Sequence, residues 1–430
     1  MSEETREGIG VNGTTLSTFV KIFKCNMELL SGKIDVMSDK VPASRRMTRE
    51  QLTKPYLVIG PPGIGKTAIL SGMANRLTEE ASKDGRNIRF GFKTLKLGDY
   101  EIGTLTGVPM FDQEKKKIVK FQPDEFPNVE RDGEYGILLL DEITTADSFQ
   151  ILPALGLTDD TRRVSNYVLP PNWIVVAAGN GPECRNFVRL DDMLISRFIT
   201  FDINYSYKED FRSFAETSHV HPLVIAYLDF KPDDVLSVKS TEYDKAGKAF
   251  PCPRSWFDLS ILIKQREAFG TVTADDLAVI AGSKIGKETA LKFAAFYRFK
   301  ESLVFDVDKI FTGRERMPSE FVKLPEEQFF IIMQYISARF KDLLEEDSVN
   351  PTYSVALLTQ STHAINWILD FGKIMLDRVL LALIRLTRTV KGTQDLLTSH
   401  EFEQYCPQLN RFFEVNAEAF AKIDITRMGG

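Results

Sequence analysis

A glycine-rich loop between an apolar run and a helical stretch constrains this chain more than any other feature. Residues 56–77 read YLVIGPPGIGKTAILSGMANRL. Four of them fit the pattern G-x-x-x-x-G-K-[ST]: Gly60, Gly65, Lys66 and Thr67. Tyr56–Ile59 suits a buried strand, and the residues from Thr67 onward have apolar side chains at helical spacing. A strand, a tight loop and a helix in this order turn several backbone N–H groups toward one anion.

Each position of this loop has a chemical use. The absence of a Cβ at Gly63 and Gly65 lets the backbone approach phosphates closely. Lys66 would reach the β- and γ-phosphates, and the hydroxyl of Thr67 would hold Mg²⁺. The sequence therefore predicts a nucleoside triphosphate site. Its binding residues are Gly60, Pro61, Pro62, Gly63, Ile64, Gly65, Lys66 and Thr67.

Length and charge limit the other possibilities. At 430 residues, and with about 150 residues per domain as a guide, two or three domains are expected. The formal net charge of -6 gives no global basic footprint for nucleic acid. One basic run precedes the first strand, and we interpret it as a solvated linker, with a binding site as the alternative. Its members are Lys40, Arg45, Arg46, Arg49 and Lys54.

The cysteines indicate a cytoplasmic setting. Cys25, Cys184, Cys252 and Cys406 are widely spaced and form no C-x-x-C pair. Without a signal peptide, this spacing favours reduced thiols and argues against a structural zinc site. No apolar run approaches the length needed to span a bilayer. We expect a soluble, cytoplasmic protein without a membrane segment.

The first half of the chain alternates short β-type runs with helical stretches, which predicts an α/β fold with a parallel sheet flanked by helices. The predicted strands are Tyr56–Ile59, Ile88–Leu95, Gly136–Leu140, Trp173–Ala178 and Phe198–Ile203. After residue 204 the pattern is helical, with long helices expected at Glu326–Glu346 and Thr362–Val390. The predicted divisions are a tail and helix (1–50), a nucleotide-binding domain (51–203), a helical lid (204–315) and a C-terminal helical region (316–430).

Two further strands end in polar side chains that complete the predicted site. Residues 137–142 read ILLLDE, so a buried strand ends at Asp141 and Glu142. Asp141 would lie near the Mg²⁺ held by Thr67, and Glu142 would act as the catalytic base on a water in line with the γ-phosphate. The run WIVVAAGN ends at Asn180, whose amide could orient that water. Gly-Asn-Gly also suits an ordinary turn.

The ordered set GPPGIGKT, LLLDE, AAGN and LDDMLISRF resembles the AAA+ ATPases, specifically the MoxR-like and dynein-related branch. The resemblance covers about residues 50–260. It implies a P-loop AAA+ core followed by an α-helical lid, with ATP and Mg²⁺ as cofactors. The segment 102–121 looks like the hairpin insertion typical of this branch. The segment 146–173 looks like the approach to sensor 1.

The resemblance also implies roles for single residues. Asn180 corresponds to sensor 1, Arg197 to the arginine finger that serves a neighbouring subunit, and Arg254 to the sensor 2 arginine of the lid. A guanidinium suits these roles because it is always charged and presents a fixed fork to phosphate oxygens. A surface salt bridge is the alternative for either arginine. Gly181 intervenes between Asn180 and Pro182, so Arg185 or Arg189 in the following loop could supply the finger instead.

An arginine finger that acts on a neighbour requires a ring, and by resemblance that ring would be a hexamer. The favoured function is ATP-driven remodelling or maturation of a protein partner, as in MoxR-like chaperones. The resemblance suggests a client with a von Willebrand factor A-type (VWA) domain. A nucleic-acid motor and a nucleotide-gated scaffold with little turnover are the alternatives. The acidic charge argues against the motor, and Glu142 with Arg197 argues against the scaffold. The Lys115–Lys117 run suits a solvated turn, or a loop that contacts a polymer.

Overall fold

The computed structural model describes residues 13–416, apart from 115, 122–123, 183, 185–186, 238–248, 271, 304, 319–323, 349, 351, 373–375 and 391. The expectations for Lys115 and Arg185 therefore lie outside the described residues. The chain divides into two compact units. The first comprises Met1–Ser206, Val238–Lys248 and Cys252–Arg254, and the second comprises Tyr207–Ser237, Ala249–Pro251 and Ser255–Gly430.

A five-stranded parallel sheet forms the centre of the first unit. Its strands are β1 (Tyr56–Ile59), β2 (Phe90–Lys96), β5 (Tyr135–Asp141), β8 (Asn172–Gly179) and β9 (Ile199–Asp202). They lie in the order β2-β5-β8-β1-β9, and every neighbouring pair is parallel. The strand that precedes the glycine-rich loop thus lies inside the sheet, between β8 and β9. Because the strands are parallel, the residues that follow β1, β5 and β8 meet at one edge.

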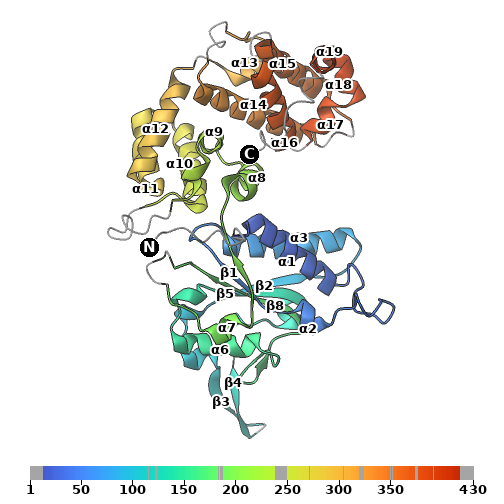
Figure 1. Cartoon of the computed structure of the whole chain (residues 1–430), viewed down its shortest axis with the longest axis vertical. Coiled ribbons are helices and arrows are strands. Elements are labelled where there is room, and N and C mark those ends of the chain that lie inside the picture. Colours follow the sequence, from blue (N-terminus) through green and yellow to red (C-terminus); the bar gives the residue numbers. More distant parts are fainter. Residues whose placement is uncertain are drawn as a thin grey trace, which may run out of the picture. The chain divides into compact units, whose positions relative to one another are not determined.

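Helices cover both faces of this sheet, as Figure 1 shows. On one face lie α1 (Leu16–Leu30) and α3 (Lys66–Lys83). On the other lie α6 (Ser148–Thr158) and α7 (Asp192–Ile195). Strand side chains that are buried against α6 and α7 include Leu57, Leu138 and Ala177. All eight residues of β8 are buried, as expected for a strand covered on both sides.

Short elements connect the layers of the first unit. They are the helices α2 (Arg49–Leu52), α4 (Ile102–Leu105) and α5 (Val129–Asp132) with the 3-10 turns η1 (Leu97–Asp99) and η2 (Ile143–Thr145). Two antiparallel hairpins are also present, one of β3 (Val108–Asp112) and β4 (Lys117–Phe121), the other of β6 (Arg163–Val164) and β7 (Tyr167–Val168). The expected hairpin at 102–121 is thus present from Val108 onward, but its first residues form α4.

The second unit is helical. It begins with a π-helical turn, η3 (Tyr207–Phe211), followed by α8 (Arg212–Thr217), α9 (Pro222–Phe230), η4 (Pro232–Val235), α10 (Pro253–Ala268), α11 (Ala274–Ile285) and α12 (Lys287–Glu301). The remaining helices are α13 (Val307–Phe311), α14 (Glu326–Asp347), α15 (Val355–Gly372), α16 (Leu376–Thr389), α17 (Thr393–Leu397), α18 (His400–Tyr405) and α19 (Pro407–Val415). The first two residues of α10 belong to the first unit.

Two apolar clusters hold the helices of the second unit. The rings of Tyr227, Trp256 and Phe293 pack edge to face or tilted, with centroids 5.2–5.5 Å apart, and join α9, α10 and α12. A separate core joins α14, α15 and α16 through buried residues such as Ile336 and Ile368. Each fully buried side chain of this kind contributes about 1.5–3 kcal/mol.

The fold class is therefore the expected one, a P-loop α/β core with a parallel sheet flanked by helices, followed by helical regions. All five predicted strands are present, although β2 begins at Phe90 rather than Ile88. The reason is local, because the N–H of Ile88 donates to the carbonyl of Arg86 in a turn. The helical stretch expected at Thr362–Val390 falls on α15 and α16, but α15 begins earlier, at Val355. Residues 373–375 between the two lie outside the described residues.

Candidate functional site

The glycine-rich loop connects β1 directly to α3. Gly63 and Gly65 have φ angles of 77° and 88°, a left-handed conformation that side chains with a Cβ rarely adopt. The helix begins at Lys66, so its first N–H groups lie at the end of the loop without helical partners. This arrangement matches the anion-binding geometry expected from the motif.

Lys66 lies across the loop. Its Nζ donates to the carbonyl oxygens of Gly60 at 2.8 Å and Pro61 at 3.1 Å. It also donates to Oδ1 of Asn180 at 3.3 Å. The ammonium therefore links the loop after β1 to the residue after β8. A phosphate placed at the loop would meet a cation that is already positioned.

Thr67 and Asp141 meet across the sheet edge. The Thr67 hydroxyl donates to Oδ2 of Asp141 at 2.7 Å. The other carboxylate oxygen of Asp141 accepts the backbone N–H of Glu142 at 3.0 Å. A hydroxyl next to a carboxylate is a donor set that suits Mg²⁺, which prefers hard oxygen ligands. The structure thus places together the two predicted metal residues, which are 74 positions apart in the chain.

Glu142 has an unusual backbone conformation and a cationic partner. Its φ of 55° is left-handed, which is uncommon for a residue with a Cβ and frequent at functional sites. Its carboxylate lies 3.1 Å from Nζ of Lys96, the last residue of β2. The hydrogen bond and charge of Glu142 raise the pKa of Lys96 above its usual value. The predicted catalytic base is therefore held in an ion pair at the protein surface.

Asn180 follows β8, and its backbone is also fixed. Its N–H donates to the hydroxyl of Thr144 at 2.9 Å, and Thr144 is fully buried. The side-chain oxygen of Asn180 accepts from Lys66. Lys96 and Thr144 are contacts that the sequence reasoning missed. Lys96 becomes a neighbour of Glu142 only through the β2–β5 register, which pairs it with Asp141, and Thr144 carries no sequence signal.

Arg197 contacts α6. Its Nη1 donates to the carbonyl of Leu155 at 2.8 Å and lies 3.9 Å from the carboxylate of Asp159. Its side chain is 30% exposed. Arg189 is much more accessible, at 82%, and lies 3.5 Å from Asp192. Neither arginine makes a described polar contact with the glycine-rich loop.

The backbone of Arg254 contacts the glycine-rich loop. Its N–H donates to the carbonyl of Gly63 at 3.1 Å, while its side chain is exposed. Cys252, which the sequence reasoning did not connect with this site, is buried against the same glycine. A Cβ on Gly63 would lie 2.5 Å from Sγ of Cys252. The close packing of Cys252 against the loop therefore requires glycine at position 63.

Together, these groups suit a magnesium–nucleoside triphosphate. Lys66 and the N-terminus of α3 offer charge and N–H groups for phosphate oxygens, and Thr67 and Asp141 offer oxygen ligands for the metal. The predicted residues that meet are Lys66 with Asn180, and Thr67 with Asp141. Arg197 instead contacts Leu155 and Asp159.

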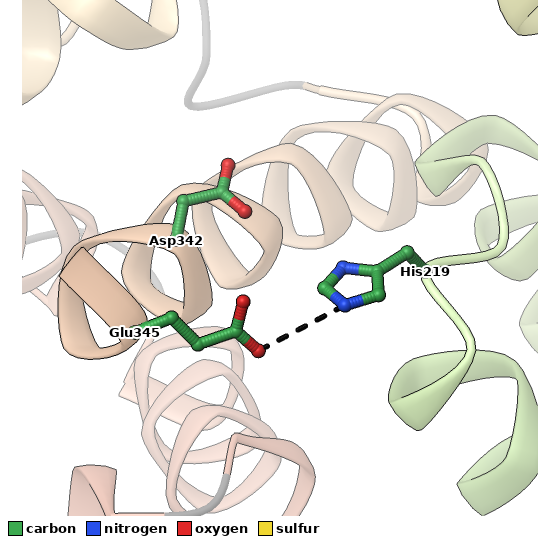
Figure 2. Close-up of side chains that lie close together, drawn as sticks. All are labelled: His219, Asp342 and Glu345. Atoms are coloured by element: carbon green, nitrogen blue, oxygen red, sulfur yellow. Dashed lines mark ion pairs between the residues drawn. The ribbon is translucent and has the colours of Figure 1, made fainter. Parts of the chain in front are cut away.

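A second cluster of possible ligands lies in the second unit (Figure 2). Among the described residues, His219, Asp342 and Glu345 form the only group of three that could hold a metal, with ligand atoms within 4.8 Å of one another. Nζ of Lys341, however, lies 3.3 Å from Nδ1 of His219 and 3.7 Å from Glu345. If Nδ1 accepts this hydrogen bond, the ring proton is on Nε2, which then cannot ligate a metal. We interpret the group as an ion-pair network.

Among the described residues, no helix is both long and apolar enough to cross a membrane. No protein-family model matches the chain.

Two solved structures are similar to the chain over most of its length. One is a candidate ATPase from Cytophaga hutchinsonii, with 12% identity, 84% of this chain and 85% of that chain covered, and a TM-score of 0.28. The other is a mutant of RuvB from Thermotoga maritima, with 14% identity, 80% and 88% coverage, and a TM-score of 0.29.

Proposed function

We propose that the chain binds ATP with Mg²⁺ and hydrolyses it. The observation that carries this proposal is the meeting of Thr67 and Asp141 at 2.7 Å, beside Lys66 and Asn180 at 3.3 Å. These four residues come from three segments of the chain. Each provides a group that phosphoryl transfer from a nucleotide requires.

The roles follow from the geometry. Lys66 and the N–H groups at the start of α3 bind and orient the phosphates. Thr67 and Asp141 hold Mg²⁺, which offsets negative charge on the phosphates when it is bound. Glu142 is the general base that takes a proton from the attacking water, after its carboxylate has separated from Lys96. Asn180 orients that water, because its side chain lies beside Lys66 at the same edge of the sheet.

The proposal extends to an assembly. Arg197 acts on the ATP of a neighbouring subunit in a homo-oligomeric ring, which we propose to be a hexamer. Arg254 contacts the nucleotide as a sensor, in a helical lid formed by residues 204–315. The 30% exposure of the Arg197 side chain and the exposed side chain of Arg254 support these roles.

Hydrolysis would drive the remodelling or maturation of a protein partner in the cytoplasm, in the manner of MoxR-like chaperones. The β3–β4 hairpin supports a protein rather than a nucleic-acid client. It exposes apolar side chains, among them Met110 at 56%, Phe111 at 64% and Ile118 at 69%, and such groups favour protein contacts. A VWA domain is the proposed client, which rests on the resemblance alone.

One observation favours a second candidate, a nucleotide-gated scaffold with little turnover. The ion pair of Glu142 with Lys96 occupies the carboxylate that the catalytic base needs. If this pair persisted with ATP bound, the chain would bind nucleotide without hydrolysing it. The two candidates differ in one measurable quantity, the rate of ATP turnover at saturating nucleotide.

The test compares ATP binding and hydrolysis in two variants. Lys66→Ala should weaken ATP binding at least about tenfold, since it removes a charge-assisted contact with phosphate. Glu142→Gln should bind ATP as tightly as the unaltered chain but hydrolyse it about 100- to 10,000-fold more slowly.

Matched controls are Lys83→Ala, at the far end of α3, and Glu130→Gln, in α5; both side chains are exposed. Undiminished ATP affinity in Lys66→Ala would refute the nucleotide site. Unaltered turnover in Glu142→Gln would remove Glu142 from its role.

A further inference from the structure

We propose that a pocket in the first unit binds a compact phosphate-bearing molecule, at a site that shares no lining residue with the glycine-rich loop. The pocket has a volume of about 470 Å³ and lies between α1, α2 and the residues that connect them. Arg45, Arg46 and Lys54 line it, together with Ser44 and Gln51. We call it the basic pocket.

The charge of this region favours an anion. Between residues 40 and 54 the chain has five basic residues and one acidic residue, Glu50, although the whole chain carries a net charge of -6. No carboxylate lines the basic pocket. Arg45 and Lys54 form no ion pair with another described residue. Two positive charges at the pocket therefore lack a protein counterion, and an anion from solution would supply one.

The third cation is held in place. Arg46 forms an ion pair at 2.7 Å with Asp39, whose side chain is 99% exposed, and donates to the carbonyl of Val41. These contacts fix the guanidinium beside the pocket and neutralise part of its charge. Binding should therefore depend mainly on Arg45 and Lys54.

The loop that carries the arginines is ordered by its own hydrogen bonds. The Asp35 carboxylate accepts the backbone N–H groups of Met37 at 3.2 Å and Ser38 at 3.0 Å. The N–H of Met47 donates to the carbonyl of Val36 at 2.8 Å and closes the loop. A ligand that binds here would not have to pay the entropy of ordering this backbone.

The charges and the volume of the pocket indicate the class of ligand. Guanidinium and ammonium groups together suit phosphate oxygens. The volume lies within the range of small-molecule sites, about 300–1,000 Å³. A nucleic-acid strand would need a basic stripe that follows its backbone, whereas these cations line one pocket. We therefore assign the site to a phosphate group that is free or attached to a small molecule.

The experiment uses the full chain with Lys66→Ala, so that the glycine-rich loop contributes little to phosphate binding. Inorganic phosphate is titrated at low ionic strength and followed by calorimetry. We expect one saturable site per chain. Adding Arg45→Gln and Lys54→Gln should weaken binding at least tenfold. Adding Lys208→Gln and Arg298→Gln, which remove two exposed charges elsewhere, should change it less than twofold.

Two outcomes would overturn the proposal. Equal phosphate binding in the two sets of variants would show that the basic pocket is not the site. The second is a single-stranded oligonucleotide that displaces phosphate and whose binding is weakened by Arg45→Gln and Lys54→Gln more than phosphate binding is. That result would assign the site to nucleic acid. Thermal unfolding midpoints show whether the variants fold. If the variant with both substitutions does not fold, the single Lys54→Gln variant gives the same test, because the Lys54 side chain is exposed and its loss should not disturb the fold.

Discussion

At the scale of single residues, the candidate site consists of groups that a motif can predict and partners that it cannot. The pairing of Thr67 with Asp141 was predictable, because a phosphate-binding loop and an acidic strand end have one functional arrangement. The ion pair of Glu142 with Lys96 was not. Charged residues near strand ends are common, and only the β2–β5 register makes these two neighbours. Thr144 and Cys252 are further examples, since burial beside the loop leaves no pattern in the sequence.

The Lys96 contact gives a prediction about the resting rate. Lys96→Ala should release the Glu142 carboxylate and raise the basal rate of ATP turnover about two- to fivefold, because an exposed ion pair restrains its partner only weakly. ATP affinity should stay within about twofold of the unaltered value. Steady-state kinetics would show this as a change in kcat with little change in KM. Lys83→Ala, an exposed lysine at the end of α3, is the control. A fall in kcat would mean that Lys96 assists the base instead of restraining it.

At the scale of elements, apolar patterning predicted the strands well and the helix ends poorly. Tyr56–Ile59 was found with its exact bounds, because a short apolar run between polar segments has few other structures. The start of α15 was missed, because the helix begins at Val355 rather than Thr362, where the Ser354 hydroxyl accepts the N–H of Leu357. The α4 helix before the β3–β4 hairpin is too short for a periodic pattern to appear.

The packing of β5 against β8 depends on one glycine. A Cβ on Gly136 would lie 2.6 Å from the indole ring of Trp173, which is fully buried and donates to the carbonyl of Gly133. Gly136→Ala should therefore lower the free energy of unfolding of the first unit by about 1–3 kcal/mol, the usual effect of overpacking. Urea unfolding followed by tryptophan fluorescence would measure it. Gly98→Ala is the matched control, because its Cβ would meet no atom within 4 Å. Equal stability of the two variants would show that Trp173 moves at little energetic cost.

At the scale of the whole molecule, four predicted site residues contact one another within one chain, whereas Arg197 does not contact them. Lys66, Thr67, Asp141 and Asn180 meet within one chain. Arg197 contacts Leu155 of α6 instead. An arginine that completes a neighbour's site would have such a position in an isolated chain. The proposed assembly therefore rests on Arg197 rather than on the nucleotide site itself.

Arg197→Ala tests this separation. The variant should bind ATP within about twofold of the unaltered affinity but hydrolyse it about 1,000-fold more slowly, the typical effect of a lost arginine finger. Mixing it with Glu142→Gln subunits, which retain Arg197, should restore part of the activity. Arg189→Ala, which removes a more exposed arginine of the same region, should leave turnover close to normal. Activity that no mixture restores would refute the role between subunits. Loss of activity in Arg189→Ala instead would move the finger to that residue.

The most direct test of the central claim is the rate of ATP turnover per subunit over a wide range of protein concentrations, with Glu142→Gln as the blank. The account predicts a rate above the blank that rises with concentration and then saturates, because in the proposed assembly Arg197 completes the site of a neighbouring subunit. A rate equal to that of Glu142→Gln at every concentration would contradict the account.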